Sequence, residues 1–314
     1  MDARRLGHSG LKISQIGIGT WINFSSVEEN HRSLIASAMK ENIFHFDTAD
    51  LYGAMPGWSE ELLGKTLKDI RRSSYVLATK VCTKVGEMPN DKGLSRKHIM
   101  ESCDRSLRRL QTDYIDIYYC HRFDPETSLH ETMDAFSTLK KQGKILYAGI
   151  SMWKADQIKE FCELAKEYKV QVIANQLLYN VLQRPSKEVL EVCEQYGVGL
   201  VPYSPLAQGL LSGKYMNGLP ESSRGAKPYR NKWILKLLED DQLKVGMQQF
   251  HKICNEANIP LIAAAYGWLL SQPNVSGTVS GFSSKEQLDE LLSYSFELSE
   301  NVIHELNEIS YQIK

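Results

Sequence analysis

Apolar, strand-like segments alternate with segments of helical periodicity eight times along the chain. The first strand-like segment is Ile16–Thr20, the last is about Ser276–Ser280, and most connections between them are short. Such alternation predicts a parallel sheet covered by helices, and eight repeats favour a closed (β/α)8 barrel over an open, doubly wound sheet. Alternation around Gly7 and Gly10 predicts a short β-hairpin before the first barrel strand. We therefore expect an α/β fold of the TIM-barrel type.

One long segment interrupts this alternation. Residues 205–240 follow the seventh predicted strand, are rich in Gly, Pro, Ser and Lys, and show little periodicity. A loop of this length in a compact domain is usually functional. No linker-like stretch divides the chain, and 314 residues suit one barrel. We expect a single domain, residues 1–314, with a long loop after strand seven.

Composition excludes several classes of function. The net charge is −1, whereas a nucleic-acid surface needs a basic stripe. The six cysteines are far apart and form no Cys-x-x-Cys, so neither a zinc site nor a disulfide framework is suggested. The first residues lack the apolar core of a signal peptide, and no apolar run approaches the roughly 20 residues of a membrane span. We expect a cytoplasmic protein with buried thiols, no bound metal, and no nucleic-acid or membrane partner.

Ionisable side chains follow three successive predicted strands. The strand that begins at Ile43 is followed by Asp47 and Tyr52, the next strand ends on Lys80, and the third ends on His121. In a (β/α)8 barrel the carboxyl ends of all strands meet at one face, where catalytic residues gather. Each residue alone has an ordinary explanation, such as a solvated lysine or a structural histidine. Their occurrence at three consecutive strand ends favours a catalytic site.

These four residues suit proton transfer to a carbonyl oxygen. A phenol has a reference pKa of about 10, and a nearby ammonium lowers it by stabilising the phenolate. We therefore expect Lys80 to lower the pKa of Tyr52, and Asp47 to keep Lys80 protonated. His121 is expected to orient the carbonyl oxygen. Such a site favours carbonyl reduction, in which negative charge grows on oxygen as hydride reaches carbon.

The common nucleotide-binding fingerprints are absent from the sequence. Gly17 and Gly19 do not continue into Gly-x-Gly-x-x-Gly, and residues 209–214 are one residue short of a P-loop. A barrel can instead bind phosphate through the loops after its last two strands and a helix amino terminus. Groups suited to phosphate occur there: Lys214, Arg224, Gly281, Ser283, Lys285 and Gln287. A solvated charged loop is the alternative explanation.

Three segments resemble the active-site segments of the aldo-keto reductase superfamily. They are Phe-Asp-Thr-Ala-Asp-Leu-Tyr-Gly at 46–53, Ala-Thr-Lys at 78–80 and Tyr-Cys-His-Arg-Phe-Asp-Pro at 119–125. Two more segments, 93–98 and 203–215, are most similar to the voltage-gated potassium channel β-subunit group and its microbial relatives. The resemblance extends from Leu6 to the last predicted helix, with the motifs in order at strand ends.

The resemblance implies an NADP-dependent oxidoreductase that reduces aldehydes or ketones reversibly to alcohols. It implies that Tyr52 is the general acid, tuned by Lys80 and Asp47. Trp21, Tyr52 and His121 are the residues expected to face the small carbonyl substrate. The channel β-subunits suggest an alternative, a redox-sensing, NADPH-binding regulatory subunit of a larger assembly. A non-redox barrel that binds a sugar phosphate is a third reading, and a homo-oligomer is compatible with all three.

The resemblance also implies which residues hold the cofactor. Ser151 and Gln176 match the residues that bond the nicotinamide carboxamide, and Tyr203 matches the aromatic residue that stacks on its ring. Other cofactor-contacting positions are matched by Thr20, Trp21, Asp47, Ser204, Pro205, Leu206, Ala207, Gln208, Arg224, Ser283, Gln287 and Glu290. A positive charge near the 2′-phosphate favours NADPH over NADH. Met152 and Leu291 depart from the family pattern, and each replaces a polar contact.

Overall fold

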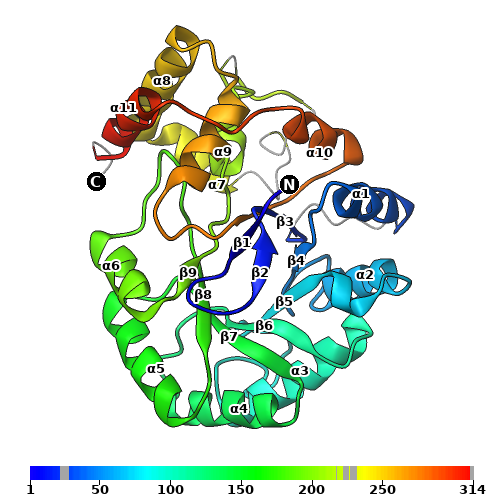
Figure 1. Cartoon of the computed structure of the whole chain (residues 1–314). Coiled ribbons are helices and arrows are strands. Elements are labelled where there is room, and N and C mark those ends of the chain that lie inside the picture. Colours follow the sequence, from blue (N-terminus) through cyan, green and yellow to red (C-terminus); the bar gives the residue numbers. More distant parts are fainter. Residues whose placement is uncertain (22–27, 217, 222–225, 227–231, 312–314) are drawn as a thin grey trace. The chain divides into compact units, whose positions relative to one another are not determined.

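The computed structural model describes residues 1–21, 28–216, 218–221, 226 and 232–311 (Figure 1). Contacts divide the chain into two compact units. Unit 1 comprises Met1–Leu177, Ser186–Val201 and Ser276–Leu288. Unit 2 comprises Leu178–Pro185, Pro202–Val275 and Asp289–Lys314. That the whole chain acts as one domain stays a prediction.

Unit 1 contains eight parallel strands whose order in the sheet follows their order in the sequence (Figure 1). The last strand, β10, pairs with the first of them, β3, and β4 to β9 follow in turn. At the other edge, the N–H of Ser276, just before β10, donates to the carbonyl of Leu200 in β9 (3.0 Å). With helices between the strands, this arrangement confirms the predicted α/β fold of the (β/α)8 type. The strands are β3 Ile16–Gly19, β4 His45–Asp47, β5 Val76–Val81, β6 Ile115–Cys120, β7 Ile145–Ser151, β8 Val172–Gln176, β9 Gly199–Leu200 and β10 Thr278–Ser280.

The predicted amino-terminal hairpin is present. Its strands, β1 (Ala3–Arg5) and β2 (Lys12–Ser14), pair antiparallel. The turn places Gly7 at a φ of 54°, where a Cβ would lie 2.2 Å from the Gly197 carbonyl oxygen. Only glycine fits both the left-handed backbone and this close approach. The hairpin is thereby fixed against the segment that leads into β9.

Helices of unit 1 alternate with the strands and bury one face each. In α4, for example, Met133, Phe136 and Leu139 recur at helical spacing and are fully buried. Phe136 stacks on Tyr118 of β6, with ring centroids 5.5 Å apart. These helices are α1 Glu28–Lys40, α2 Trp58–Leu67, α3 Arg96–Leu110, α4 Leu129–Lys141, α5 Ala155–Glu167 and α6 Lys187–Tyr196. Their packing holds the strands, and hence the strand ends, in fixed positions.

Unit 2 is built mainly from helices. The predicted loop 205–240 contains a 3-10 helix, η2 (Ala207–Ser212), and α7 (Lys232–Glu239) in its described part. Helix α8 (Asp241–Glu256) is capped by Asp240, whose carboxylate accepts hydrogen bonds from the backbone N–H groups of Gln242 and Leu243. Helix α9 (Leu261–Ser271) is buried from residue 263 to residue 270. The terminal helix α11 spans Glu300–Tyr311, and α10, Lys285–Leu292, has residues in both units.

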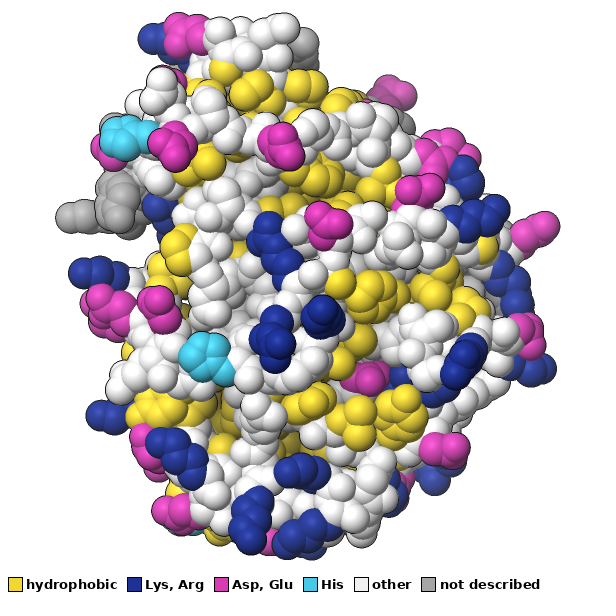
Figure 2. Space-filling view, in the orientation of Figure 1, with side chains coloured by type: hydrophobic (Ala, Val, Ile, Leu, Met, Phe, Trp, Pro, Cys, Tyr) yellow, Lys and Arg dark blue, Asp and Glu magenta, His cyan; other side chains and the backbone are white. Residues whose placement is uncertain are grey.

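Four further properties bear on function. Among the helices described, none has the length and apolar character needed to cross a bilayer. The described ranges also hold no group of three or more His, Cys, Asp or Glu side chains that could bind a metal ion. All six cysteines are buried free thiols, as predicted. Figure 2 shows acidic and basic side chains interspersed over the visible face.

Candidate active site

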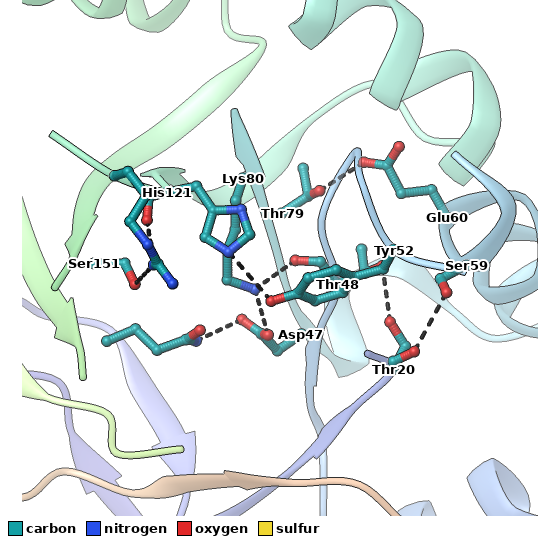
Figure 3. A network of polar contacts seen from close by, with 12 residues as sticks. Thr20, Asp47, Thr48, Tyr52, Ser59, Glu60, Thr79, Lys80, His121 and Ser151 are labelled. Carbon is teal, nitrogen blue, oxygen red and sulfur yellow. Dashed lines mark hydrogen bonds and ion pairs between the residues drawn. The ribbon is translucent and has the colours of Figure 1, made fainter. Parts of the chain in front are cut away.

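A buried ion pair lies at the carboxyl ends of β4 and β5 in unit 1. Asp47 is aligned with Ala78 in the strand register, so Asp47 and Lys80 project from the same side of the sheet. The Lys80 ammonium donates to Asp47 Oδ1 and to the Thr48 carbonyl oxygen, both at 2.6 Å (Figure 3). The Lys80 side chain is fully buried and that of Asp47 is 3% exposed. The contact with the Thr48 carbonyl was not foreseen from the sequence.

Tyr52 and His121 meet beside this ion pair. The Tyr52 hydroxyl lies 3.4 Å from His121 Nε2, and the two rings meet edge to face (Figure 3). Lys80 Nζ is 4.8 Å from the centre of the Tyr52 ring. The backbone of His121 is held in place, because its backbone N–H donates to the Val81 carbonyl oxygen of β5 (2.8 Å). The four residues singled out from three strand ends therefore come together in one cluster.

Burial and charge set the protonation states of the cluster. Burial disfavours the Lys80 ammonium and lowers its pKa, but charge interactions and hydrogen bonds with Asp47 and Tyr52 raise it more. The net effect is a raised pKa of Lys80. Burial, with the charges of Lys80 and Arg122, lowers the pKa of His121 to about 2. At neutral pH the site therefore holds an ammonium and a neutral imidazole. Which ring nitrogen of His121 carries the proton depends on the bond that Nε2 makes.

The charge of Lys80 lowers the pKa of Tyr52, as expected, but it does not set the net direction of the shift. Burial raises the pKa of Tyr52 above its ordinary value, and the charge of Lys80 opposes this effect without overcoming it. Loss of water around the phenolate costs more free energy than the ammonium restores. Tyr52 is therefore a protonated hydrogen-bond donor throughout the neutral range, rather than a phenol with a pKa close to neutrality.

Polar side chains from three other strand ends surround the cluster. Gln176, at the end of β8, donates from Nε2 to Asp47 Oδ2 (2.8 Å), so both carboxylate oxygens are engaged. Thr20, just after β3, donates from Oγ1 to Thr48 Oγ1 (2.8 Å) and is buried. Ser151, at the end of β7, is 1% exposed. The structure places these three residues around the cluster, and their contact with a cofactor stays a prediction.

A second buried network interacts electrostatically with the loop between Asp47 and Tyr52. Glu60 of α2 is fully buried, accepts from the Thr79 hydroxyl (2.6 Å) and forms an ion pair with Arg109 (2.6 Å). Asp50 lies in the loop, is 2% exposed, and its carboxyl oxygens have no hydrogen-bond partner among the described residues. Burial, then the charge of Glu60, holds the pKa of Asp50 well above its usual range. Burial thus favours the protonated, neutral form of the Asp50 carboxyl group in the folded protein.

We expect Asp50→Asn to stabilise the protein more at about pH 8 than at about pH 5. Because the folded state raises the pKa of Asp50, the wild type loses stability as the pH rises above the ordinary carboxyl pKa of about 4. An amide does not ionise, so the variant does not lose stability in this way. The difference is about 1.4 kcal/mol for each unit by which folding raises the pKa of Asp50. Urea unfolding at both pH values measures the difference. The exposed Asp69→Asn variant is the control, and an equal effect of Asp50→Asn at both pH values contradicts a buried neutral carboxyl.

The remaining cofactor candidates of unit 1 lie after β3 and after β10. Trp21 follows Thr20 directly and is 44% exposed. Gly281 and Ser283 follow β10, and the N–H of Ser283 donates to Gln287 Oε1 of α10 (2.8 Å). Gln287 thus organises the amino end of α10, where backbone N–H groups can meet an anion. Lys285 is the first residue of the same helix.

The candidates of unit 2 include a loop of unusual backbone conformation. Ser204, Ala207 and Gln208 have φ values of 55°, 46° and 60°, in the left-handed region that side chains disfavour. Gln208 donates from Nε2 to Ser204 Oγ (3.1 Å) and Asn180 donates to the Ser204 carbonyl (3.2 Å), which hold the turn. Backbone strain of this kind is concentrated at ligand-binding sites. Tyr203, Pro205 and Leu206 belong to the same turn, Lys214 and Glu290 are exposed, and Arg224 lies outside the described residues.

Comparison with known proteins identifies the family. The family model described as "Aldo/keto reductase family" matches residues 15–311. The chain belongs to the aldo/keto reductase family. This membership agrees with the fold and with the resemblance of the three strand-end motifs.

Curated relatives of this family member include an enzyme and two channel proteins. L-glyceraldehyde 3-phosphate reductase of Escherichia coli (strain K12) is 34% identical, over 92% of this chain and 86% of the relative. Two plant proteins carry the name "probable voltage-gated potassium channel subunit beta". The one from Oryza sativa subsp. japonica is 38% identical and the one from Arabidopsis thaliana 37%, each over 92% of this chain and 90% of the relative. Family and reductase together support an oxidoreductase that acts on carbonyl compounds.

Proposed function

We propose that the protein catalyses the NADPH-dependent reduction of aldehydes or ketones to alcohols, a reversible hydride transfer. The observation that carries this proposal is the contact of the Tyr52 hydroxyl with His121 Nε2, at 3.4 Å, beside the buried Lys80–Asp47 pair. Two neutral hydrogen-bonding groups at this spacing can bind one carbonyl oxygen. The fixed ammonium stabilises the negative charge that develops there during reduction.

Each residue of the cluster then has a distinct role. Tyr52 binds the carbonyl oxygen and donates its proton to it, so the phenol O–H bond breaks as the alcohol O–H bond forms. Lys80 stabilises the resulting phenolate and is held in place by Asp47. His121 stays neutral, and its Nε2–H orients the carbonyl oxygen. Trp21, with Tyr52 and His121, faces the substrate in this proposal.

NADPH, when bound, supplies the hydride. The chemistry of the donor set fits its nicotinamide carboxamide, because Ser151 offers a buried hydroxyl and Gln176 directs its amide nitrogen to Asp47. The amide oxygen of Gln176 then serves as an acceptor for the carboxamide N–H. We assign the other cofactor roles on the resemblance: in unit 1 to Thr20, Trp21, Asp47, Gly281, Ser283 and Gln287, and in unit 2 to Tyr203, Ser204, Pro205, Leu206, Ala207, Gln208, Lys214, Arg224 and Glu290. Six buried free thiols favour a reducing, cytoplasmic compartment.

We expect NADPH to bind at least about tenfold more tightly than NADH, because a charged hydrogen bond to the 2′-phosphate contributes about 1.5–3 kcal/mol. A fluorescence titration with each nucleotide measures this preference. Nicotinamide absorbance then follows turnover of an aldehyde panel, which includes glyceraldehyde 3-phosphate because the name of one relative specifies that substrate. Failure of both nucleotides to bind contradicts the proposal and favours the non-redox barrel.

The two plant relatives favour a second candidate, an NADPH-binding regulatory subunit of a larger assembly. Such a subunit retains the cofactor but turns over slowly and co-purifies with its partner. Size-exclusion chromatography of the protein from its own cells separates the candidates. A free species with rapid turnover supports the enzyme, whereas a slow species in a larger complex supports the subunit.

A further inference from the structure

Arg122 is a cation at the candidate active site, and the proposed reaction assigns it no role. It follows His121 directly, after the end of β6, and is exposed. Its Nη1 donates to the His121 carbonyl oxygen at 2.6 Å and to Ser151 Oγ at 3.4 Å. These two contacts tie the guanidinium to the ends of β6 and β7.

The contacts of Arg122 leave its charge uncompensated. Both of its acceptors are neutral oxygens, and within the described ranges Arg122 forms no ion pair with a carboxylate. Other arginines of unit 1 differ, since Arg72 is paired with Asp116 and Arg109 with Glu60. A guanidinium has five N–H donors in a planar fork, so donors on Arg122 remain for a ligand.

The charge of Arg122 also reaches the reacting groups. It contributes to lowering the pKa of His121, after burial and Lys80, and it opposes the rise in the pKa of Tyr52. Arg122 is exposed, is bonded to the His121 carbonyl and Ser151, and has no ion pair among the described residues. It is thus placed to meet a substituent of the substrate.

We propose that Arg122 binds an anionic group, phosphate or carboxylate, that a short-chain aldehyde substrate carries beyond its carbonyl carbon. This inference rests on the proposed function, because it places the carbonyl oxygen at Tyr52 and His121. The planar fork matches two oxygens of such an anion. A hydrogen bond to a charged group is stronger than one between neutral groups, so the anion distinguishes the substrate from its neutral counterpart.

The test compares phosphorylated and unphosphorylated glyceraldehyde, with succinic semialdehyde and butyraldehyde as the carboxylate pair. For the wild type we expect kcat/KM to be at least about tenfold higher for the anionic member of one pair, and that pair identifies the anion. Arg122→Gln is expected to lose most of this preference through KM, and Arg122→Lys to retain part of it. Lys84→Gln is the matched control, because Lys84 follows β5, is 55% exposed and is paired with Glu87. It should keep the preference.

A binding measurement keeps the inference testable without turnover. Glycerol 3-phosphate should raise the thermal unfolding temperature of the wild type more than glycerol does, and Arg122→Gln should abolish the difference. A wild type that turns over both members of each pair equally overturns the inference alone, as does an Arg122→Gln variant that keeps the preference. Absence of turnover with NADPH and every aldehyde defeats the proposed function instead, and the thermal shift then decides the role of Arg122.

Discussion

Tyr52→Phe should lower kcat for aldehyde reduction by about 10²–10⁴-fold while leaving NADPH affinity within about threefold of the wild type. The substitution removes only the hydroxyl that lies 3.4 Å from His121 Nε2, and the ring that contacts Lys80 remains. The alkoxide then has no positioned proton donor. Steady-state turnover and a fluorescence titration of NADPH separate the loss of proton transfer from any loss of binding.

A matched substitution controls for the loss of a tyrosine hydroxyl. Tyr118 is fully buried, and its hydroxyl has no hydrogen-bond partner among the described residues, so Tyr118→Phe should leave turnover nearly unchanged. Because the pKa of Tyr52 is raised, wild-type reduction should also stay constant from about pH 6 to pH 9. Retained turnover in Tyr52→Phe would falsify the assignment of the acid, and a fall in rate across the neutral range would contradict its protonation state.

Lys80→Met should destabilise the protein by about 3–5 kcal/mol and abolish most turnover. The change leaves the Asp47 carboxylate buried without the ammonium that contacts it at 2.6 Å. An unpaired buried charge is costly. The expected loss is on the order of a third of the free energy of unfolding of a typical domain, which is about 5–15 kcal/mol. Urea unfolding measures the stability, and nicotinamide absorbance measures the turnover.

The double variant Asp47→Asn/Lys80→Met distinguishes charge burial from packing. Removing both charges should recover part of the lost stability, because neither position then holds an unpaired buried charge, but it should not recover turnover. Lys84→Met, which breaks the exposed pair with Glu87, should change stability little. Equal stability of Lys80→Met and the wild type would show that the buried pair does not hold the fold.

The strand-end residues were predictable because a parallel sheet aligns the carboxyl ends of its strands. The sequence placed Asp47, Lys80 and His121 at consecutive strand ends, and the register of β4, β5 and β6 brings them together. The hairpin was equally predictable, since the alternation of residues around Gly7 and Gly10 is a local signal in the sequence. In both cases neighbours in the sequence become neighbours in the sheet, so little long-range information is needed.

Properties that depend on burial were not predictable in the same way. The sequence indicated that Lys80 lies near Tyr52, but the direction of the Tyr52 pKa depends on how much water is lost around it. The raised pKa of Asp50 likewise depends first on burial and then on the charge of Glu60, which belongs to α2. Arg122 lies in the motif at 119–125, yet only the structure shows that it has no carboxylate partner among the described residues. The contact of Gln176 with Asp47 joins residues 129 positions apart in the chain.

The contact of Gln176 with Asp47 gives this carboxylate a structural role in addition to its place in the cluster. Asp47 is bonded on one side by Lys80 of the adjacent β5 and on the other by Gln176 of β8, a strand that is not its neighbour in the sheet. The carboxylate is therefore a crosslink across the interior of the strands as well as a counter-ion. Loss of catalysis would therefore leave the structural role of Asp47 intact. The Tyr52 hydroxyl, which contacts His121 Nε2, is the group whose removal should affect the chemistry alone.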